Sequence, residues 1–191
     1  MNYIVNRELR KFHEGFSRND YDIDTLIIHC TAGGSSANSC IKWMSNGGLL
    51  ADGTKREKDY KKGIALFHYL IDLNGDIYEI INPHNFVYHS STGIFDKTTI
   101  GIELVNTDRN NSKPVTKEQY KALAELYLFI NNNINKIDNI YGHGAIKMIK
   151  TGKNKVCPGL GFDWYKFLLE LTKSNINAKL FNNDKHIEIT V

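Results

Sequence analysis

The 191-residue sequence is poor in arginine and has little net charge. Arginine supplies only five of its 24 basic residues, at positions 7, 10, 18, 56 and 109, and 21 acidic residues bring the net charge to +3. Recognition of nucleic acids favours the bidentate arginine fork and usually shows as a strongly basic patch. We therefore expect no nucleic-acid partner.

Long apolar runs are also missing. The first residues, MNYIVNRELRKF, lack the apolar stretch of about 7–15 residues that a secretory signal peptide needs. No later segment approaches the roughly 20 apolar residues of a membrane span. The sequence thus predicts a protein with no membrane span that is cytoplasmic on synthesis.

Cysteine and proline are scarce, with three of each. An odd number of cysteines in a chain that does not look secreted argues against a disulfide framework, and leaves one free to act as a ligand or nucleophile. The prolines lie between periodic segments, and neither a repeat nor a flexible linker appears. We expect a single, monomeric domain over residues 1–191, with its core at about 22–172 and a C-terminal tail at 174–191.

Four runs in the chain have the pattern of strands. Residues 24–30 form a short apolar run before a small-residue loop, which indicates a buried strand. Residues 64–72 and 76–81 flank an Asn-Gly pair, the strongest short signal for a hairpin. In the run 98–105, isoleucine and leucine alternate with Thr99, Gly101 and Glu103, so the two sets face opposite sides of a strand.

Helical patterns lie between and after these strands. Ser35 or Ser36 can cap a helix to about Met44, a capping box opens a helix over 116–131, and a further amphipathic helix covers about 162–173. The tail is expected to add an edge strand or to stay mobile. The fold class is therefore α/β, a central mixed β-sheet flanked by helices.

Two histidines and one cysteine have the context of a functional site. His29 and His143 each follow a β-like run and precede a small-residue loop, where a cleft commonly forms. Cys157 is followed directly by Pro158. Two imidazoles and a thiolate suit zinc and leave its fourth position open for water. The spacing matches no compact zinc motif, so a structural role for these residues stays open at this point.

Four segments, taken in order, resemble the zinc-dependent N-acetylmuramoyl-L-alanine amidases. They are LIIHCTA, FHYLIDLNGDIYE, TIGIELVN and YGHGAIK…KNKVCPGLGFDW. This family includes phage lysozyme-like amidases, cytoplasmic anhydro-muropeptide amidases and peptidoglycan recognition proteins. The resemblance covers about residues 22–172 and implies the type 2 amidase, or peptidoglycan recognition protein-like, fold.

The resemblance also implies roles for individual residues. It implies that His29, His143 and Cys157 hold Zn²⁺. Glu103 matches the acidic residue that is the catalytic base in the cytoplasmic branch, and Lys155 matches a lysine or threonine position two residues before the last ligand. We expect Glu103 to act as acid and base and Lys155 to stabilise the oxyanion.

The sequence departs from the phage branch at Phe67, where that branch carries a catalytic tyrosine. Phenylalanine cannot exchange a proton, which is a second reason to assign this chemistry to Glu103. His89 is expected either to contact substrate or to cap a loop, and His68 to be packed. The remaining cysteines, Cys30 and Cys40, are interpreted as structural thiols.

The implied reaction is hydrolysis of the amide between N-acetylmuramic acid and L-alanine in peptidoglycan. Cys157 favours a phage or prophage endolysin that reaches the cell wall after release, which is the preferred interpretation. Glu103 favours the alternative, a cytoplasmic recycling amidase that acts on anhydro-muropeptides. A non-catalytic peptidoglycan-binding module and a zinc hydrolase for another wall bond are further alternatives. The Gly-punctuated segment 46–63 is expected to border the substrate groove.

Overall fold

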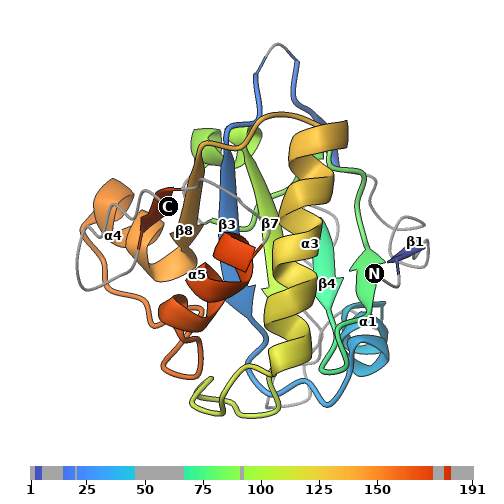
Figure 1. The fold of residues 1–191 in the computed structure, drawn as a ribbon. Helices are drawn as coiled ribbons and strands as arrows, with labels where there is room; N and C mark the ends of the chain where they lie inside the picture. The colour runs from blue at the N-terminus through green and yellow to red at the C-terminus, as the bar shows by residue number, and fades with distance from the viewer. Residues whose placement is uncertain are drawn as a thin grey trace.

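The computed structural model describes residues 3–5, 15–19, 21–45, 67–90, 93–173 and 179–181. Its centre is a seven-stranded mixed sheet in the order β1-β5-β4-β7-β3-β8-β9 (Figure 1). The strands of this sheet are β1 (Tyr3–Val5), β3 (Thr25–Cys30), β4 (Tyr69–Ile71), β5 (Ile77–Glu79), β7 (Thr99–Leu104), β8 (Asn139–Gly142) and β9 (Lys179–Phe181). Two short strands, β2 (Phe16–Ser17) and β6 (Asn85–Phe86), pair separately.

The middle of the sheet is parallel and carries the site. β3 lies between β7 and β8 and runs parallel to both, and all of its residues are buried. A strand that is covered on both faces reads as a continuous apolar run, which is why residues 24–30 were recognisable in the sequence. The predicted strands at 24–30 and 98–105 are confirmed as β3 and β7.

The predicted hairpin is formed by β4 and β5, which pair antiparallel around Asn74 and Gly75. Gly75 has a φ of +86°, a left-handed conformation that glycine adopts without steric cost, and its N–H donates to the Asp72 carbonyl at 2.9 Å. Of the expected strand at 64–72, residues 64–66 lie outside the described residues, and β4 comprises Tyr69–Ile71.

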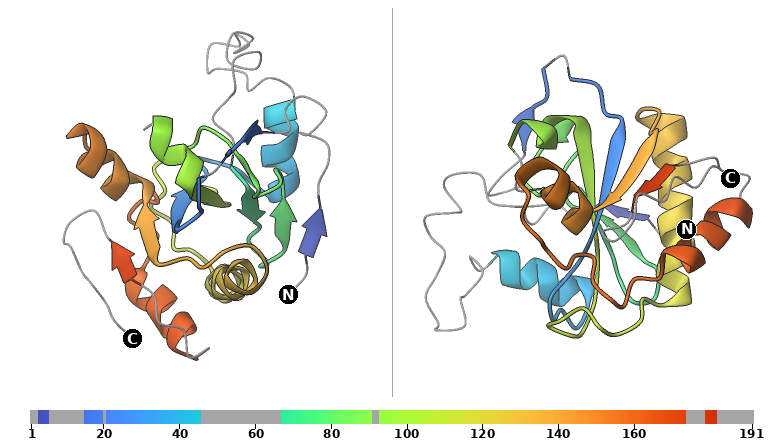
Figure 2. Two further views of the ribbon diagram at one scale, coloured as in Figure 1. Left: turned by 90° about the horizontal axis from the view of Figure 1, so that it is seen from above. Right: turned by 90° about the vertical axis from the view of Figure 1, so that its left-hand side faces the viewer.

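Helices cover both faces of the sheet. They are α1 (Ala37–Ser45), the 3-10 helix η2 (Gly93–Thr98), α3 (Lys117–Asn133), α4 (His143–Thr151) and α5 (Trp164–Lys173). α3 and α5 lie on one side of the sheet, and α1 and η2 lie on the other (Figure 2). Together with the strands they confirm the predicted α/β class with a mixed sheet.

α3 is fixed by the capping box that the sequence predicts. The Gln119 N–H donates to Thr116 Oγ1 at 3.1 Å, and the Thr116 N–H donates to Gln119 Oε1 at 3.1 Å. Gln119 Nε2 also donates to the Val105 carbonyl at 2.9 Å, which ties the first turn of α3 to the end of β7. Removing such a cap typically costs about 1 kcal/mol.

The alternation of side chains along β3 and β7 separates the core from the site. Leu26 and Ile28 of β3 pack with Ile102 of β7 in the cluster that includes α3 and α5. Because neighbouring side chains point to opposite faces of a strand, His29 and Glu103 lie on the other face. This assignment agrees with the sequence prediction for Glu103.

Some elements differ from the sequence prediction. α4, which begins at His143, was not predicted. The tail at 174–191 agrees with one of its two predicted outcomes, because it contributes β9, an edge strand parallel to β8. The segment 46–63 lies outside the described residues. Within the part of the chain that the structure describes, no helix has the length and apolarity needed to cross a membrane.

Candidate metal centre and active site

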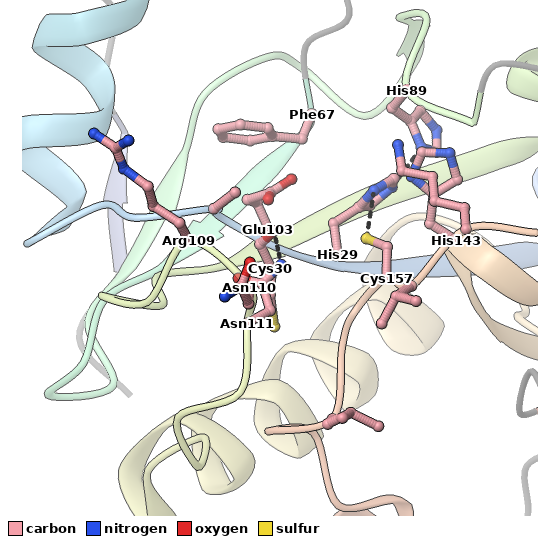
Figure 3. A pocket seen from close by; sticks show the side chains of 14 residues that line it. His29, Cys30, Phe67, His89, Glu103, Arg109, Asn110, Asn111, His143 and Cys157 are labelled. Carbon is pink, nitrogen blue, oxygen red and sulfur yellow. Dashed lines mark hydrogen bonds between the residues drawn. The ribbon is translucent and has the colours of Figure 1, made fainter. Parts of the chain in front are cut away.

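Three buried side chains meet at the carboxyl edge of the parallel strands. His29 is the next-to-last residue of β3, His143 begins α4 directly after β8, and Cys157 lies in the loop between α4 and α5. Their candidate ligand atoms all lie within 4.8 Å of one another (Figure 3). Because β3 and β8 are parallel, their carboxyl ends share one edge of the sheet, which brings together residues far apart in sequence.

The geometry of the cluster fits a metal ion. Cys157 Sγ lies 3.9 Å from His29 Nδ1, and the rings of His29 and His143 are 4.5 Å apart between centroids. Both ring nitrogens of His143 are buried and make no hydrogen bond of normal geometry with any residue that the structure describes. Buried nitrogens without partners are rare and unfavourable, and a cation bound to one of them would satisfy it.

The electrostatics of the three groups suit the same role. Burial is the largest cause that holds the pKa of His29 well below its usual value, and the charge of His143 is the next largest. Burial, followed by the charge of Lys155, lowers the pKa of His143 to about 3. Both rings are therefore neutral near pH 7, the form that binds metal. Burial, followed by the charge of Glu103, raises the pKa of the Cys157 thiol to about 12. A coordinated divalent cation deprotonates such a thiol, so this donor set of two nitrogens and one sulfur matches zinc.

Glu103 lies beside this cluster on β7. It pairs in register with His29, is half-buried, and points from the same face of the sheet. Burial raises the pKa of its carboxyl to about 8, against the opposing charge of Lys155. A carboxyl with a pKa in this range can both accept and return a proton near neutral pH.

A cavity of about 670 Å³ adjoins these groups. Its walls include the three candidate ligands and Glu103, together with Phe67, His89, Lys155, Leu160 and the loop residues Arg109, Asn110 and Asn111. Lys155 is exposed, lines the cavity, and its positive charge acts on His143 and Glu103. Phe67 provides an apolar part of the cavity wall. The structure thus brings all of the predicted site residues to one cavity.

His89 and His68 form a second layer behind the cluster. His89 Nδ1 lies 3.1 Å from His29 Nε2, and His89 Nε2 lies 3.0 Å from Thr99 Oγ1. Both nitrogens of His89 therefore face protein groups, which leaves its ring carbons for the predicted substrate contact. His68 is fully buried and accepts a hydrogen bond from the Gly101 N–H at 2.9 Å, as expected of a packed residue.

The loop that follows β7 has a structural role that no sequence pattern predicts. Asn111 Nδ2 donates to the Cys30 carbonyl at 3.2 Å, and the Asn111 carbonyl accepts from the Gly161 N–H at 2.8 Å. This residue connects the end of β3 to the loop that carries Cys157. A Cβ on Gly159 would lie 2.4 Å from Asn111 Cβ, so this position has no room for a side chain. The two closely spaced glycines, Gly159 and Gly161, were the only sign in the sequence that another part of the chain packs closely here.

Arg18 was also missed, because nothing around it in the sequence marks it as buried. Its guanidinium donates to the carbonyls of Pro83 at 2.9 Å and Thr99 at 2.8 Å, and also bonds the carbonyl of Lys97. Burial lowers its pKa to about 10, against the opposing effect of Asp96. At that value it still stays charged at neutral pH and holds the chain that leads into β7.

The predicted structural roles of the other cysteines agree with the structure. All three cysteines are free. Cys30 is buried in the core on the α3 side of the sheet, and Cys40 of α1 is half-buried against the core of the opposite side. No disulfide framework is present among these three residues.

Fold and site together define a class of protein: an α/β domain in which the carboxyl edge of the parallel strands, with the helix and loop that follow β8, brings two histidines, a cysteine and a carboxylate to one cavity. The sequence profile of the N-acetylmuramoyl-L-alanine amidase family matches residues 19–160, and the chain belongs to this family. Comparison with curated protein sequences gives no significant match.

Solved structures show the same fold at low sequence identity. The N-acetylmuramoyl-L-alanine amidase LysC from Clostridium intestinale URNW is 18% identical, with a TM-score of 0.65, and the match covers 93% of this chain and 99% of LysC. A selenomethionine derivative of AmpD is 18% identical, with a TM-score of 0.61 and coverage of 89% and 93%. Human PGRP-IBETAC in complex with glycosamyl muramyl pentapeptide is 18% identical, with a TM-score of 0.59 and coverage of 84% and 92%. The predicted type 2 amidase fold is confirmed, and family membership supports a peptidoglycan amidase activity.

Proposed function

We propose that the protein is a zinc-dependent hydrolase that cleaves the amide between N-acetylmuramic acid and L-alanine in peptidoglycan, and that it acts as a phage or prophage endolysin. The observation that carries this proposal is the cluster of His29, His143 and Cys157 beside Glu103. Zinc held by the cluster would polarise the scissile carbonyl and lower the pKa of a coordinated water.

The residues of this chain supply the proton chemistry. Glu103 accepts a proton as water attacks the carbonyl carbon, and returns it to the nitrogen as the carbon–nitrogen bond breaks. The products are the lactyl carboxylate of the sugar and a stem peptide with a free L-alanine amino group. A general acid and base of this kind typically contributes about 10²–10⁴-fold to the rate.

Lys155 and Phe67 shape the rest of the reaction site. Lys155 places its positive charge beside the carbonyl oxygen, where negative charge develops in the transition state. Phe67 forms an apolar wall, which lowers the local dielectric and strengthens that interaction. It cannot exchange a proton, so this role stays with Glu103.

A cytoplasmic amidase that acts on soluble anhydro-muropeptides is the second candidate, and Glu103 is the observation that favours it. A binding module without activity is less well supported, because the full set of three donors and a carboxyl with a raised pKa is more than binding requires. The endolysin assignment, with release to the cell wall, is supported by Cys157 through the family resemblance.

Product identification tests this proposal. The purified protein is incubated with intact peptidoglycan and with a soluble anhydro-muropeptide, with and without a chelator, and the new termini are identified by mass spectrometry. We expect free stem peptides with an L-alanine amino end from intact peptidoglycan, and none after chelation. Cleavage of the soluble substrate alone would favour the recycling role, and cleavage at another bond or of neither substrate would overturn the proposal.

A further inference from the structure

A buried chain of polar groups runs from the candidate metal centre into the fold. His29 turns Nδ1 toward Cys157 Sγ, at 3.9 Å, and Nε2 toward His89 Nδ1, at 3.1 Å. On the far side of His89, Nε2 lies 3.0 Å from Thr99 Oγ1, and that hydroxyl lies 3.5 Å from the Asp96 carbonyl. All five residues are buried.

One placement of the imidazole and hydroxyl protons gives each hydrogen bond in this series a donor and an acceptor. A neutral imidazole carries one proton, and if His29 Nδ1 faces a cation the proton must be on Nε2. His29 Nε2–H then donates to His89 Nδ1, which leaves the His89 proton on Nε2, where it donates to Thr99 Oγ1. The Thr99 hydroxyl in turn donates to the Asp96 carbonyl.

Groups outside the cavity hold His89 in this place. A Cβ on Gly101 would lie 2.7 Å from His89 Nδ1, so the glycine in β7 makes the space that the ring occupies. Asp96 Oδ1 accepts from the backbone N–H of His89 at 3.1 Å and of Ser90 at 2.7 Å. His89 lies on the side of His29 away from Glu103 (Figure 3). Contacts with Gly101 and Asp96 thus hold the His89 ring in place on the side of His29 that faces away from Glu103.

We propose that His89 is a positioning residue that fixes the tautomer and the ring orientation of His29, so that Nδ1 is presented to the metal. The proposal rests on the metal centre of the proposed function but not on its substrate. Partners that orient a ligating histidine typically change metal affinity or activity by about 10–100-fold when they are removed. Gly101 and Thr99 act through His89 in the same way.

Zinc affinity in two variants of His89 tests the proposal. His89→Leu fills the space with an apolar side chain and removes the acceptor, whereas His89→Asn can present Oδ1 in place of Nδ1. Zinc affinity is measured by competition with a chromophoric chelator, with folding checked by circular dichroism and the exposed His84→Ala as control. We expect His89→Leu to bind zinc about 10–100-fold more weakly, His89→Asn to recover most of the loss, and His84→Ala to match the wild type. Wild-type affinity in a folded His89→Leu variant would overturn the proposal.

A second measurement needs no substitution. In the wild-type protein labelled with ¹⁵N-histidine, NMR identifies which ring nitrogen carries the proton. We expect His89 to be protonated at Nε2, and zinc addition to shift His29 at Nδ1. A His89 proton on Nδ1, or zinc at His29 Nε2, would refute the role of His89 even if the Leu variant does not fold.

The outcomes separate this inference from the proposed function. Zinc binding with the expected tautomers but without cleavage of peptidoglycan would support the positioning role and refute the substrate. Cleavage of peptidoglycan by a His89→Leu variant with unchanged zinc affinity would do the reverse. Failure of the wild-type chain to bind zinc would overturn both.

Discussion

Glu103 is the residue on which the proposed chemistry depends most. Glu103→Gln keeps the shape of the side chain and removes its ability to accept a proton. We expect kcat/KM for peptidoglycan cleavage to fall by about 10²–10⁴-fold, while zinc content measured by elemental mass spectrometry stays at the wild-type level. Full activity in this variant would show that another group is the base.

The pH dependence of the reaction follows from the same carboxyl. Burial raises the pKa of Glu103 to about 8 in the chain without a cation, and a bound cation would lower that value. Below its pKa the carboxyl is protonated and cannot accept a proton, so kcat/KM should rise with pH and level off once Glu103 is ionised. The measurement is a pH–rate profile at constant ionic strength, and Glu103→Gln should lose this rising limb. A rate that falls as pH increases from 5 to about 8 would contradict the assignment.

Lys155 offers a test of charge beside the carbonyl oxygen. Lys155→Met keeps the length of the side chain and removes its charge, so we expect kcat to fall by roughly 10²-fold or more with zinc affinity little changed. Lys153→Met, at an exposed position two residues earlier, serves as the matched control and should keep wild-type activity. If both variants lose activity equally, the effect is one of net charge, and Lys155 has no specific role.

The elements that the sequence predicts well are those with strong local patterns. β3 and β7 were recognisable from an apolar run and from alternation, and α3 from its capping box. α4 was missed because it opens with His143 and Gly144 after an N-cap glycine that makes no side-chain hydrogen bond. Glycine has low helix propensity, so tertiary contacts decide this helix.

The residues of the site also fall into those that the sequence predicts and those that it does not. The cluster of His29, His143 and Cys157 was predicted from the family resemblance, and the structure brings the three residues together. The roles of Arg18 and Asn111 depend on contacts with residues more than 60 positions away, which no local pattern encodes. The hydrogen-bonded link between His29 and His89 has the same long-range origin.

The contact between the two loops beside Cys157 gives a prediction at the level of elements. Gly159 and Gly152 both have a positive φ, at +100° and +67°, but only Gly159 would bring a Cβ against a neighbour. We expect Gly152→Ala to lower the free energy of unfolding by about 1–2 kcal/mol, the cost of a side chain at a positive φ. Gly159→Ala should lower it by the same amount and by about 1–3 kcal/mol more, because the added methyl group overpacks the contact with Asn111. Urea denaturation measures both. Zinc affinity should fall in Gly159→Ala and not in Gly152→Ala. Equal losses of stability in the two variants would contradict the prediction, because they would show that the contact between the loops can shift to accept the methyl group.

At the scale of the whole molecule, the site depends on how the sheet is ordered. β3 lies between β7 and β8, so the carboxyl ends of three parallel strands supply one ligand, the candidate base and the start of the helix that bears the second ligand. The third ligand, Cys157, comes from the loop before α5. The helix α5 itself packs against α3 on the far side of the sheet. The metal centre therefore joins parts of the fold that are distant in sequence.

X-ray absorption at the zinc edge tests the central claim most directly, because it reports the atoms bound to the metal. For protein loaded with one equivalent of zinc, we predict one sulfur at about 2.3 Å and nitrogen or oxygen neighbours at about 2.0–2.1 Å. Cys157→Ser should lose the sulfur contribution, and Cys30→Ser should keep it. A wild-type spectrum without sulfur, or one that Cys157→Ser leaves unchanged, would contradict the proposed metal centre.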